Sequence, residues 1–283
     1  MLNEMILYTK AASIDPEAFN IGGWSVRWYG LIIGLGIVVA YFLFNREGKR
    51  KGIDENTTLD LIFWRVLIGF IGARLYYVLF RLDYYLANPG QIIQIWQGGL
   101  AIYGGIIAGV ITLIVLSRRY QLSVMTVLDI AAPSVLAAQA IGRWGNFMNQ
   151  EAHGGPVARE FLESLFLPEF IIEQMNINGV YHHPTFLYES LWNIIGVALL
   201  LVLRRKSNFF RQGEVAASYL IWYGVGRAFI EGLRTDSLYL GSLRVSQWLA
   251  VLLVVASIAL IIYRRTQVYP PVPYYEADEI AKE

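Results

Sequence analysis

Five side chains that could bind an anion or move a proton lie within eleven residues of this chain. Residues 141–155 read Ile-Gly-Arg-Trp-Gly-Asn-Phe-Met-Asn-Gln-Glu-Ala-His-Gly-Gly, and the polar members are Arg143, Asn146, Asn149, Glu151 and His153. Glycine lets a backbone approach a ligand closely, and a guanidinium can grip a phosphate with two hydrogen bonds. An arginine at membrane depth is costly and therefore indicates a function. The stretch predicts binding of a phosphorylated molecule at a membrane surface.

A second polar group follows helical spacing. Tyr223, Arg227 and Glu231 recur every four residues, and Arg234 follows three residues later. All four are therefore expected on one helical face. Arg227 and Glu231 alone could be a structural ion pair, but two arginines against one acid leave a positive charge. Together with Arg143, the group favours a site for the headgroup of an anionic phospholipid.

Long apolar runs must position these residues. The chain has 283 residues, 56% hydrophobic and 16% charged, whereas a soluble domain carries about a quarter charged residues. A helix needs about 20 apolar residues to cross hydrocarbon. We predict an all-α integral membrane protein with seven transmembrane helices, at about 28–45, 59–80, 97–117, 122–143, 186–203, 214–233 and 245–263. The glycines of the third run indicate close helix packing or a bent helix lining a cavity.

The basic residues predict how these helices are oriented. Lys and Arg gather in the first, third and fifth connections and directly after the last run, at 46–51, 118–119, 204–211 and 264–265. Basic connections stay in the cytoplasm, so we expect the N-terminus outside and the C-terminus inside. The connection of residues 144–185 is expected to form a small extracytoplasmic cap on a single membrane domain of residues 1–263. Residues 264–283 are expected to be a disordered cytoplasmic tail.

Several other functions are disfavoured by composition. A net charge of +1 argues against nucleic acid as a partner, and the absence of cysteine excludes thiolate chemistry by the chain itself. No cleaved signal peptide is expected at the N-terminus. The adjacent His182 and His183 point in different directions, so we predict no metal site and no cofactor. A transporter or channel for an anion, and a phospholipid-binding structural protein, remain the competing classes.

The motifs resemble those of one family. Gly142-Arg143-x-Gly145-Asn146-Phe147-x-Asn149-x-Glu151, followed by Gly154, is similar to the signature of prolipoprotein diacylglyceryl transferases. The resemblance extends over almost the whole chain. It also covers 27–30, 72–74, 183–189 and 223–234.

The resemblance implies an enzyme of the bacterial plasma (inner) membrane whose active site faces the extracytoplasmic side. It would move the diacylglyceryl group of phosphatidylglycerol onto the lipobox cysteine thiol of preprolipoprotein signal peptides and release glycerol 1-phosphate, the first step of lipoprotein maturation. The predicted catalytic residues are Arg143, Arg227, Tyr103 and Glu151. The substrate-binding residues are Tyr29, Arg74, Asn146, Asn149, Gly154, Tyr223, Glu231 and Arg234.

Tyr103 departs from the family pattern, which usually has a histidine at this place. A phenol with an ordinary pKa of about 10 is a poor base at neutral pH but can donate a hydrogen bond. We therefore expect Tyr103 to donate to the headgroup rather than to accept the thiol proton. The nearby arginines would lower the pKa of the substrate thiol, which reduces the demand for a strong base.

Overall fold

The computed structural model describes residues 14–234, 239–240, 243–267 and 271–274, and these residues are mostly helical. Six of their helices are long and apolar enough to cross a membrane: Trp28–Arg50 (α1), Glu55–Leu79 (α2), Ile102–Arg119 (α4), Val124–Met148 (α5), Thr185–Leu203 (α8) and Val245–Arg265 (α10). The seventh predicted span corresponds to Glu214–Glu231 (α9). Three of its 18 residues are charged, and it is not among the six helices that are apolar enough to cross a membrane.

Short elements fill the connections. The helical ones are Leu82–Ala87 (α3), Pro89–Gln91 (η1), Ile95–Gln97 (η2), Arg159–Ser164 (α6) and Glu169–Gln174 (α7). The strands are Glu17–Ile21 (β1), Trp24–Arg27 (β2), Pro156–Val157 (β3), Asn176–Ile177 (β4), Val180–His182 (β5), Tyr239–Leu240 (β6) and Leu243–Arg244 (β7). They form two antiparallel hairpins and one three-stranded antiparallel sheet in the order β3-β5-β4.

The chain divides into two compact units. One contains Met1–Val39, Val135–Leu199 and Tyr219–Ile262, and the other contains Ala40–Ser134, Leu200–Ser218 and Tyr263–Glu283. The first unit is called the cap unit here because it includes the predicted cap. The second is called the α2–α4 unit.

Glycines explain how closely α2 and α4 pack in the α2–α4 unit. A Cβ atom on Gly104 would collide with the carbonyl oxygen of Gly72 and with Tyr76, and one on Gly72 would meet Ala108. The prediction of close helix packing is therefore confirmed for Gly104. The start of this span was predicted wrongly: Gly98 precedes α4 and has a positive φ of 87°, so the chain turns there and the helix begins only at 102.

Buried acids organise the ends of helices in the same unit. Asp129, fully buried in α5, accepts hydrogen bonds from the backbone N–H groups of Gly213 (2.6 Å) and Ala216 (2.9 Å). The carboxylate thus satisfies amides at the start of α9 that have no partner within the helix. This charged residue inside a span has a structural explanation.

Glu47 is the second fully buried acid. It pairs with Arg204 at 3.2 Å and with Arg205, and it accepts a hydrogen bond from the hydroxyl of Tyr274 at 2.8 Å. The backbone N–H of Tyr274 donates to Phe210 at 2.8 Å. This short part of the expected disordered tail is therefore ordered, and residues 268–270 and 275–283 lie outside the described residues.

The cap unit joins a helical part to the small cap. The indoles of Trp192 on α8 and Trp222 on α9 stack at 4.3 Å, and each donates to the other's backbone carbonyl at 3.0 Å. Indoles fit this closely because Gly196 and Gly226 leave room for them. The register between α8 and α9 is thereby fixed, which matters because both helices carry site residues.

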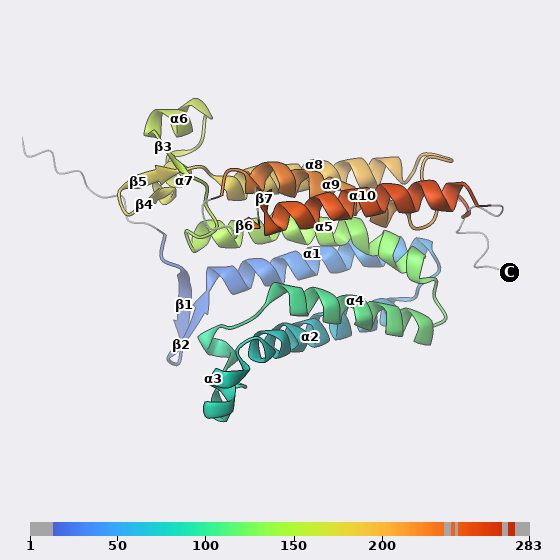
Figure 1. The fold of residues 1–283 in the computed structure, drawn as a ribbon, viewed down its shortest axis with the longest axis horizontal. Coiled ribbons are helices and arrows are strands. Elements are labelled where there is room, and N and C mark those ends of the chain that lie inside the picture. The colour runs from blue at the N-terminus through green and yellow to red at the C-terminus, as the bar shows by residue number, and fades with distance from the viewer. Residues whose placement is uncertain (1–13, 235–238, 241–242, 268–270, 275–283) are drawn as a thin grey trace, which may run out of the picture. The chain divides into compact units, whose positions relative to one another are not determined.

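The cap lies at one end of α8 (Figure 1). Its core is made of buried side chains from α5, α6, α7 and α8 and from the residue directly after α7, namely Phe147, Leu162, Ile171, Ile172, Met175 and Phe186. The buried Gln174 of α7 donates to the carbonyl oxygens of Phe147 (3.1 Å) and Met148 (3.3 Å), which are among the last of α5. These bonds satisfy carbonyls that the helix itself leaves unpaired, so the cap is fastened to the end of α5.

Candidate active site

One carboxylate joins the predicted arginines. Glu189, on the second turn of α8 and 7% exposed, pairs with Arg143 of α5 at 2.6 Å. Its other oxygen lies 3.9 Å from Arg227 and 3.9 Å from Arg234. Three guanidinium groups from three parts of the sequence thus converge on Glu189, and their side chains are only 11–22% exposed.

Arg227 also pairs with Glu231 one turn later, at 2.6 Å. This is the ion pair expected from the sequence, and it fixes the direction of the Arg227 guanidinium. The second terminal nitrogen of Arg227 lies 3.9 Å from Glu189, which is too far for a hydrogen bond. Its hydrogens can therefore reach a further acceptor, such as a phosphate oxygen.

Arg234 does not lie on the predicted helical face, because α9 ends at Glu231. It is placed by backbone pairing instead: Gly154 and Arg234 form an antiparallel bridge, and the N–H of Gly155 donates to Leu233 at 2.9 Å. The loop after α5 therefore positions the residues after α9.

That loop is tightly held. Ala152 has a left-handed φ of 57°, which is uncommon for a residue with a Cβ atom. Its carbonyl accepts a hydrogen bond from the buried hydroxyl of Thr185 at 2.6 Å. A Cβ atom on Gly154 would lie 2.6 Å from His183 and 3.1 Å from both Thr185 and the carbonyl oxygen of Leu233. At Gly154 the neighbouring segments therefore approach so closely that there is no room for a side chain.

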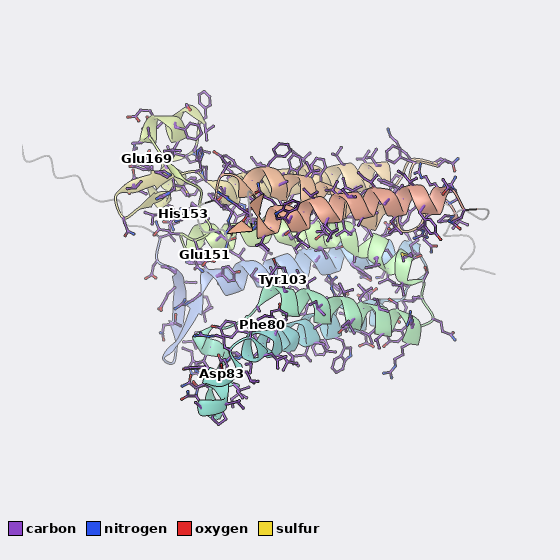
Figure 2. The ribbon with its side chains drawn as sticks, viewed as in Figure 1. Phe80, Asp83, Tyr103, Glu151, His153 and Glu169 are labelled. Carbon is purple, nitrogen blue, oxygen red and sulfur yellow. The ribbon has the colours of Figure 1, made fainter. Side chains whose placement is uncertain are left out.

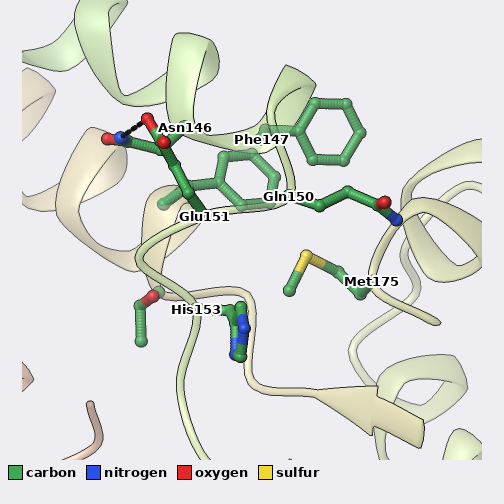
Figure 3. A pocket seen from close by; sticks show the side chains of 8 residues that line it. Asn146, Phe147, Gln150, Glu151, His153 and Met175 are labelled. Atoms are coloured by element: carbon green, nitrogen blue, oxygen red, sulfur yellow. Dashed lines mark hydrogen bonds between the residues drawn. The ribbon is translucent and has the colours of Figure 1, made fainter. Parts of the chain in front are cut away.

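Asn146 connects the arginines to this loop. The Nη1 atom of Arg143 donates to the Oδ1 atom of Asn146 at 3.4 Å, and the Nδ2 atom of Asn146 donates to Glu151 at 3.0 Å. A small pocket opens beside this chain of contacts (Figure 3), lined by Asn146, Phe147, Gln150, Glu151, His153, Met175, Thr185 and Phe186. Figure 2 places Glu151 and His153 together, where α5 meets the cap.

Three further predicted residues, Tyr29, Asn149 and Tyr223, belong to the cap unit. The ring of Tyr29 packs against Gly145, where a Cβ atom would lie 2.8 Å from it. Tyr223 contacts Tyr219 one turn earlier, with ring centroids 6.2 Å apart. The Oδ1 atom of Asn149 is buried and has no hydrogen-bond partner in the described part of the chain.

The two histidines at the end of the cap, His182 and His183, have structural contacts. The backbone N–H of Gly154 donates to the carbonyl of His183 at 3.0 Å, and Nδ1 of His182 lies 2.9 Å from the carbonyl oxygen of Gly154. Burial lowers the pKa of His183, so its imidazole is neutral at pH 7. The interpretation of this pair as hydrogen-bonding residues agrees with these contacts.

Arg74 belongs to the α2–α4 unit, where its guanidinium donates four hydrogen bonds to backbone carbonyls. Their acceptors are Gln91, Ile92, Gly98 and Gly99, at 2.7–2.9 Å. Only one N–H of the guanidinium remains for a headgroup. The four contacts therefore support a role of Arg74 in holding the loop before α4.

Tyr103 is the second residue of α4 in the same unit, and 47% of it is exposed (Figure 2). Its position beside the loop that Arg74 holds gives its hydroxyl access to the surroundings of the protein.

Glu189 was not among the predicted site residues. The sequence carried a signal for it, because a lone acid on the second turn of a strongly apolar helix needs a cationic partner. Helical spacing could not supply that partner, since Arg143, Arg227 and Arg234 all come from other segments.

The helices and the site together define a multi-pass membrane protein with a half-buried cluster of arginines. Residues 16–263 match the sequence model of the family described as prolipoprotein diacylglyceryl transferase. The chain belongs to this family.

Relatives of this chain carry the name phosphatidylglycerol–prolipoprotein diacylglyceryl transferase. The protein of Listeria welshimeri is 53% identical over 269 residues, covering 95% of this chain and 96% of the relative. The protein of Lactobacillus delbrueckii subsp. bulgaricus is 55% identical over 259 residues, covering 91% and 94%. That of Lactobacillus acidophilus is 53% identical over 258 residues, covering 91% and 92%.

Proposed function

We propose that this protein transfers the diacylglyceryl group of phosphatidylglycerol to the cysteine thiol of a prolipoprotein signal peptide. The family and the names of the relatives support this reaction. The observation within the structure that carries it is the convergence of Arg143 and Arg227 on Glu189. A half-buried group of arginines that keeps hydrogens available is suited to a phosphate that gains charge as a bond breaks.

The cluster would act on the leaving group. The thiolate of the peptide attacks the glyceryl carbon, the bond between that carbon and the phosphate oxygen breaks, and glycerol 1-phosphate leaves with the electron pair. Arg143 and Arg227 would hold the phosphate and stabilise the added charge. Glu189 and Glu231 would keep the two guanidinium groups in place. Asn146 and Glu151 would line the approach of the peptide.

The remaining predicted residues take supporting roles in this proposal. Tyr103 would donate a hydrogen bond to the headgroup. Tyr29, Asn149, Tyr223 and Arg234 would border the lipid, and Gly154 would hold the loop that carries Glu151. Arg74 would act through the loop that it fixes.

We propose seven membrane spans, with α9 as the sixth in chain order, an external N-terminus and an internal C-terminus. The basic ends of α1, α4 and α10, at 49–50, 118–119 and 264–265, support this orientation in a bacterial inner membrane. Asn146, Glu151 and the cap would then face outward, where signal peptides reach the membrane surface.

A transfer assay tests the proposal. Purified protein is incubated with phosphatidylglycerol labelled in its acyl chains and with a lipobox peptide, and the products are separated by thin-layer chromatography. We expect the label on the cysteine thioether and the release of glycerol phosphate. Binding of the lipid without transfer would indicate a lipid-binding structural protein, and passage of an anion across vesicles without transfer would indicate a transporter.

A further inference from the structure

If the protein catalyses the proposed transfer, on which this inference rests, the reaction requires an acceptor for the thiol proton. A thiol has an ordinary pKa of about 8.5, so only a few per cent is ionised at neutral pH. Arginines stabilise the thiolate once it has formed, but a guanidinium cannot take the proton. A side chain with a free lone pair must therefore lie near the place where the thiol docks.

The pocket at the end of α5 has two side chains that could do this. Glu151 and His153 both line it, and it is otherwise bounded by amide, hydroxyl and apolar groups. Asn146 belongs to the same wall and also contacts Arg143. A thiol in this pocket would thus sit beside the group that we assign to the phosphate.

The ring of His153 is oriented by the backbone. Its Nδ1 atom lies 3.1 Å from the carbonyl oxygen of Gly154. A carbonyl oxygen only accepts hydrogen bonds, so Nδ1 carries the hydrogen and Nε2 carries the lone pair. No partner for Nε2 occurs among the described residues. The rigid backbone at Gly154, where His183 and Leu233 approach closely, holds this acceptor in place.

Glu151 is less suited to the task. A carboxylate ordinarily titrates near 4.3 and an imidazole near 6.5, so proton transfer from a thiol is about two pH units more favourable to the imidazole. Efficient bases have a pKa close to the working pH. Glu151 is also exposed and already accepts a hydrogen bond from Asn146.

We propose that His153 is the general base that activates the cysteine of the peptide. Its Nε2 atom takes the proton from sulfur, and the thiolate then forms the bond to the glyceryl carbon. The carbon–oxygen bond to phosphate breaks, and the electron pair stays on the phosphate oxygen. The imidazolium returns its proton to the released glycerol phosphate or to water, so charge and protons balance.

The charged and titratable groups around His153 fit this role. The ring of His182 from β5 lies 4.2 Å away and also points its Nδ1 atom at the carbonyl of Gly154. Glu151 lines the same pocket, where its negative charge would stabilise an imidazolium, while Arg143 lies beyond Asn146. Arg234 pairs with Gly154 through its backbone.

The test compares His153→Asn with His182→Asn in the complete protein. The amide nitrogen of asparagine can replace Nδ1 as donor to Gly154, but asparagine offers no proton acceptor in place of Nε2. Transfer by His153→Asn at pH 7 should fall by about 10²-fold or more. The KM for phosphatidylglycerol and the melting temperature should stay unchanged. His182→Asn makes the same replacement at the other histidine that contacts this carbonyl, so it should keep most of the activity.

The pH profile separates a base from a structural residue. Without its base, His153→Asn should gain rate about tenfold per pH unit up to the thiol pKa near 8.5, whereas the wild type should level off above about pH 7. Full activity of His153→Asn at pH 7, or a loss with an unchanged profile, would overturn the proposal. If His182→Asn lost as much transfer activity at pH 7 as His153→Asn and regained as much at higher pH, the proposal would be overturned as well. A wild type without transfer would instead reject the proposed function itself.

Discussion

Two charged clusters in the cap unit have opposite compositions. Around Glu189, one carboxylate meets the guanidinium groups of Arg143, Arg227 and Arg234. Around Arg159, one guanidinium meets three carboxylates, namely Glu163 at 2.8 Å, Glu169 at 2.5 Å and Glu173. Figure 2 labels Glu169 within the cap.

The two clusters differ in how fully their hydrogen bonds are used. Each of the three donating nitrogens of Arg159 has a carboxylate partner, and these bonds raise the pKa of its guanidinium above the ordinary value. Two of the acids, Glu163 and Glu169, are more than half exposed. In contrast, Arg227 and Glu189 are mostly buried, and their 3.9 Å separation leaves hydrogens of Arg227 available. The comparison indicates that the Arg159 cluster fastens α6 to α7, whereas the Glu189 cluster can accept a ligand.

Arg143→Ala should have the largest effect. This guanidinium makes the 2.6 Å contact that anchors the cluster, and loss of a charged donor to a leaving phosphate costs about 10²–10³ in rate. The transfer assay measures the loss, and the yield of membrane-inserted protein is the control. Near-normal transfer would remove Arg143 from the phosphate site.

Glu189→Gln should be the next most damaging change. The substitution leaves three half-buried guanidinium groups without the carboxylate they share, and breaking such a group costs up to about 3 kcal/mol of unfolding free energy. We expect a lower melting temperature together with slower transfer. Added glycerol phosphate should restore part of the melting temperature if an anion can occupy the cluster, and no restoration would argue against an anion site.

Arg227→Lys tests geometry rather than charge. A lysine ammonium keeps the charge. It lacks the two terminal nitrogens with which the planar guanidinium can bind Glu231 and a phosphate oxygen simultaneously. Transfer should drop about tenfold or more, and Glu231→Gln should be milder. Full activity of Arg227→Lys beside an inactive Arg227→Ala would show that charge alone matters.

Tyr103→Phe should lose about tenfold in rate, the effect of one neutral hydrogen bond. Tyr103→His should remain active, because a neutral imidazole can also donate one hydrogen bond. Both variants are assayed in membranes and normalised to protein amount. Unchanged transfer in Tyr103→Phe would show that the ring only fills space.

Glu163→Gln should have the smallest effect. Exposed ion pairs contribute about 0–1 kcal/mol, and Arg159 retains two other acids. The rate of transfer should be unchanged and the melting temperature nearly so. A loss of transfer comparable to that of Glu189→Gln would erase the distinction between the two clusters.

Much of the fold follows from the sequence, because apolar length and basic ends are local properties. The helix from 55 to 79 begins at Asp54, whose side chain accepts the N–H of Thr57 at 3.0 Å, as a helix-capping residue does. The strands of the cap were not predicted, since they are only two or three residues long. β3 pairs with β5 from a distant segment, whereas β4 and β5 form a hairpin around Asn178 and Gly179.

The contacts among the candidate site residues could be predicted only in part. Arg143, Asn146 and Glu151 lie in one motif, and their chain of contacts follows from a helix end and its loop. Glu189 was missed because its partners are far away in sequence. The position of Arg234 was also not predictable, since it depends on the bridge to Gly154 rather than on helical spacing.

The most direct test of the central claim is a measurement of phosphatidylglycerol binding by Arg227→Ala and Arg159→Ala side by side with the wild type. Each purified protein is titrated with the lipid in detergent micelles, with phosphatidylcholine as the zwitterionic control. The account predicts that Arg227→Ala loses at least tenfold in affinity for phosphatidylglycerol, while Arg159→Ala binds as the wild type does. Equal affinities in all three proteins would contradict the assignment of the Glu189 cluster to the phosphate.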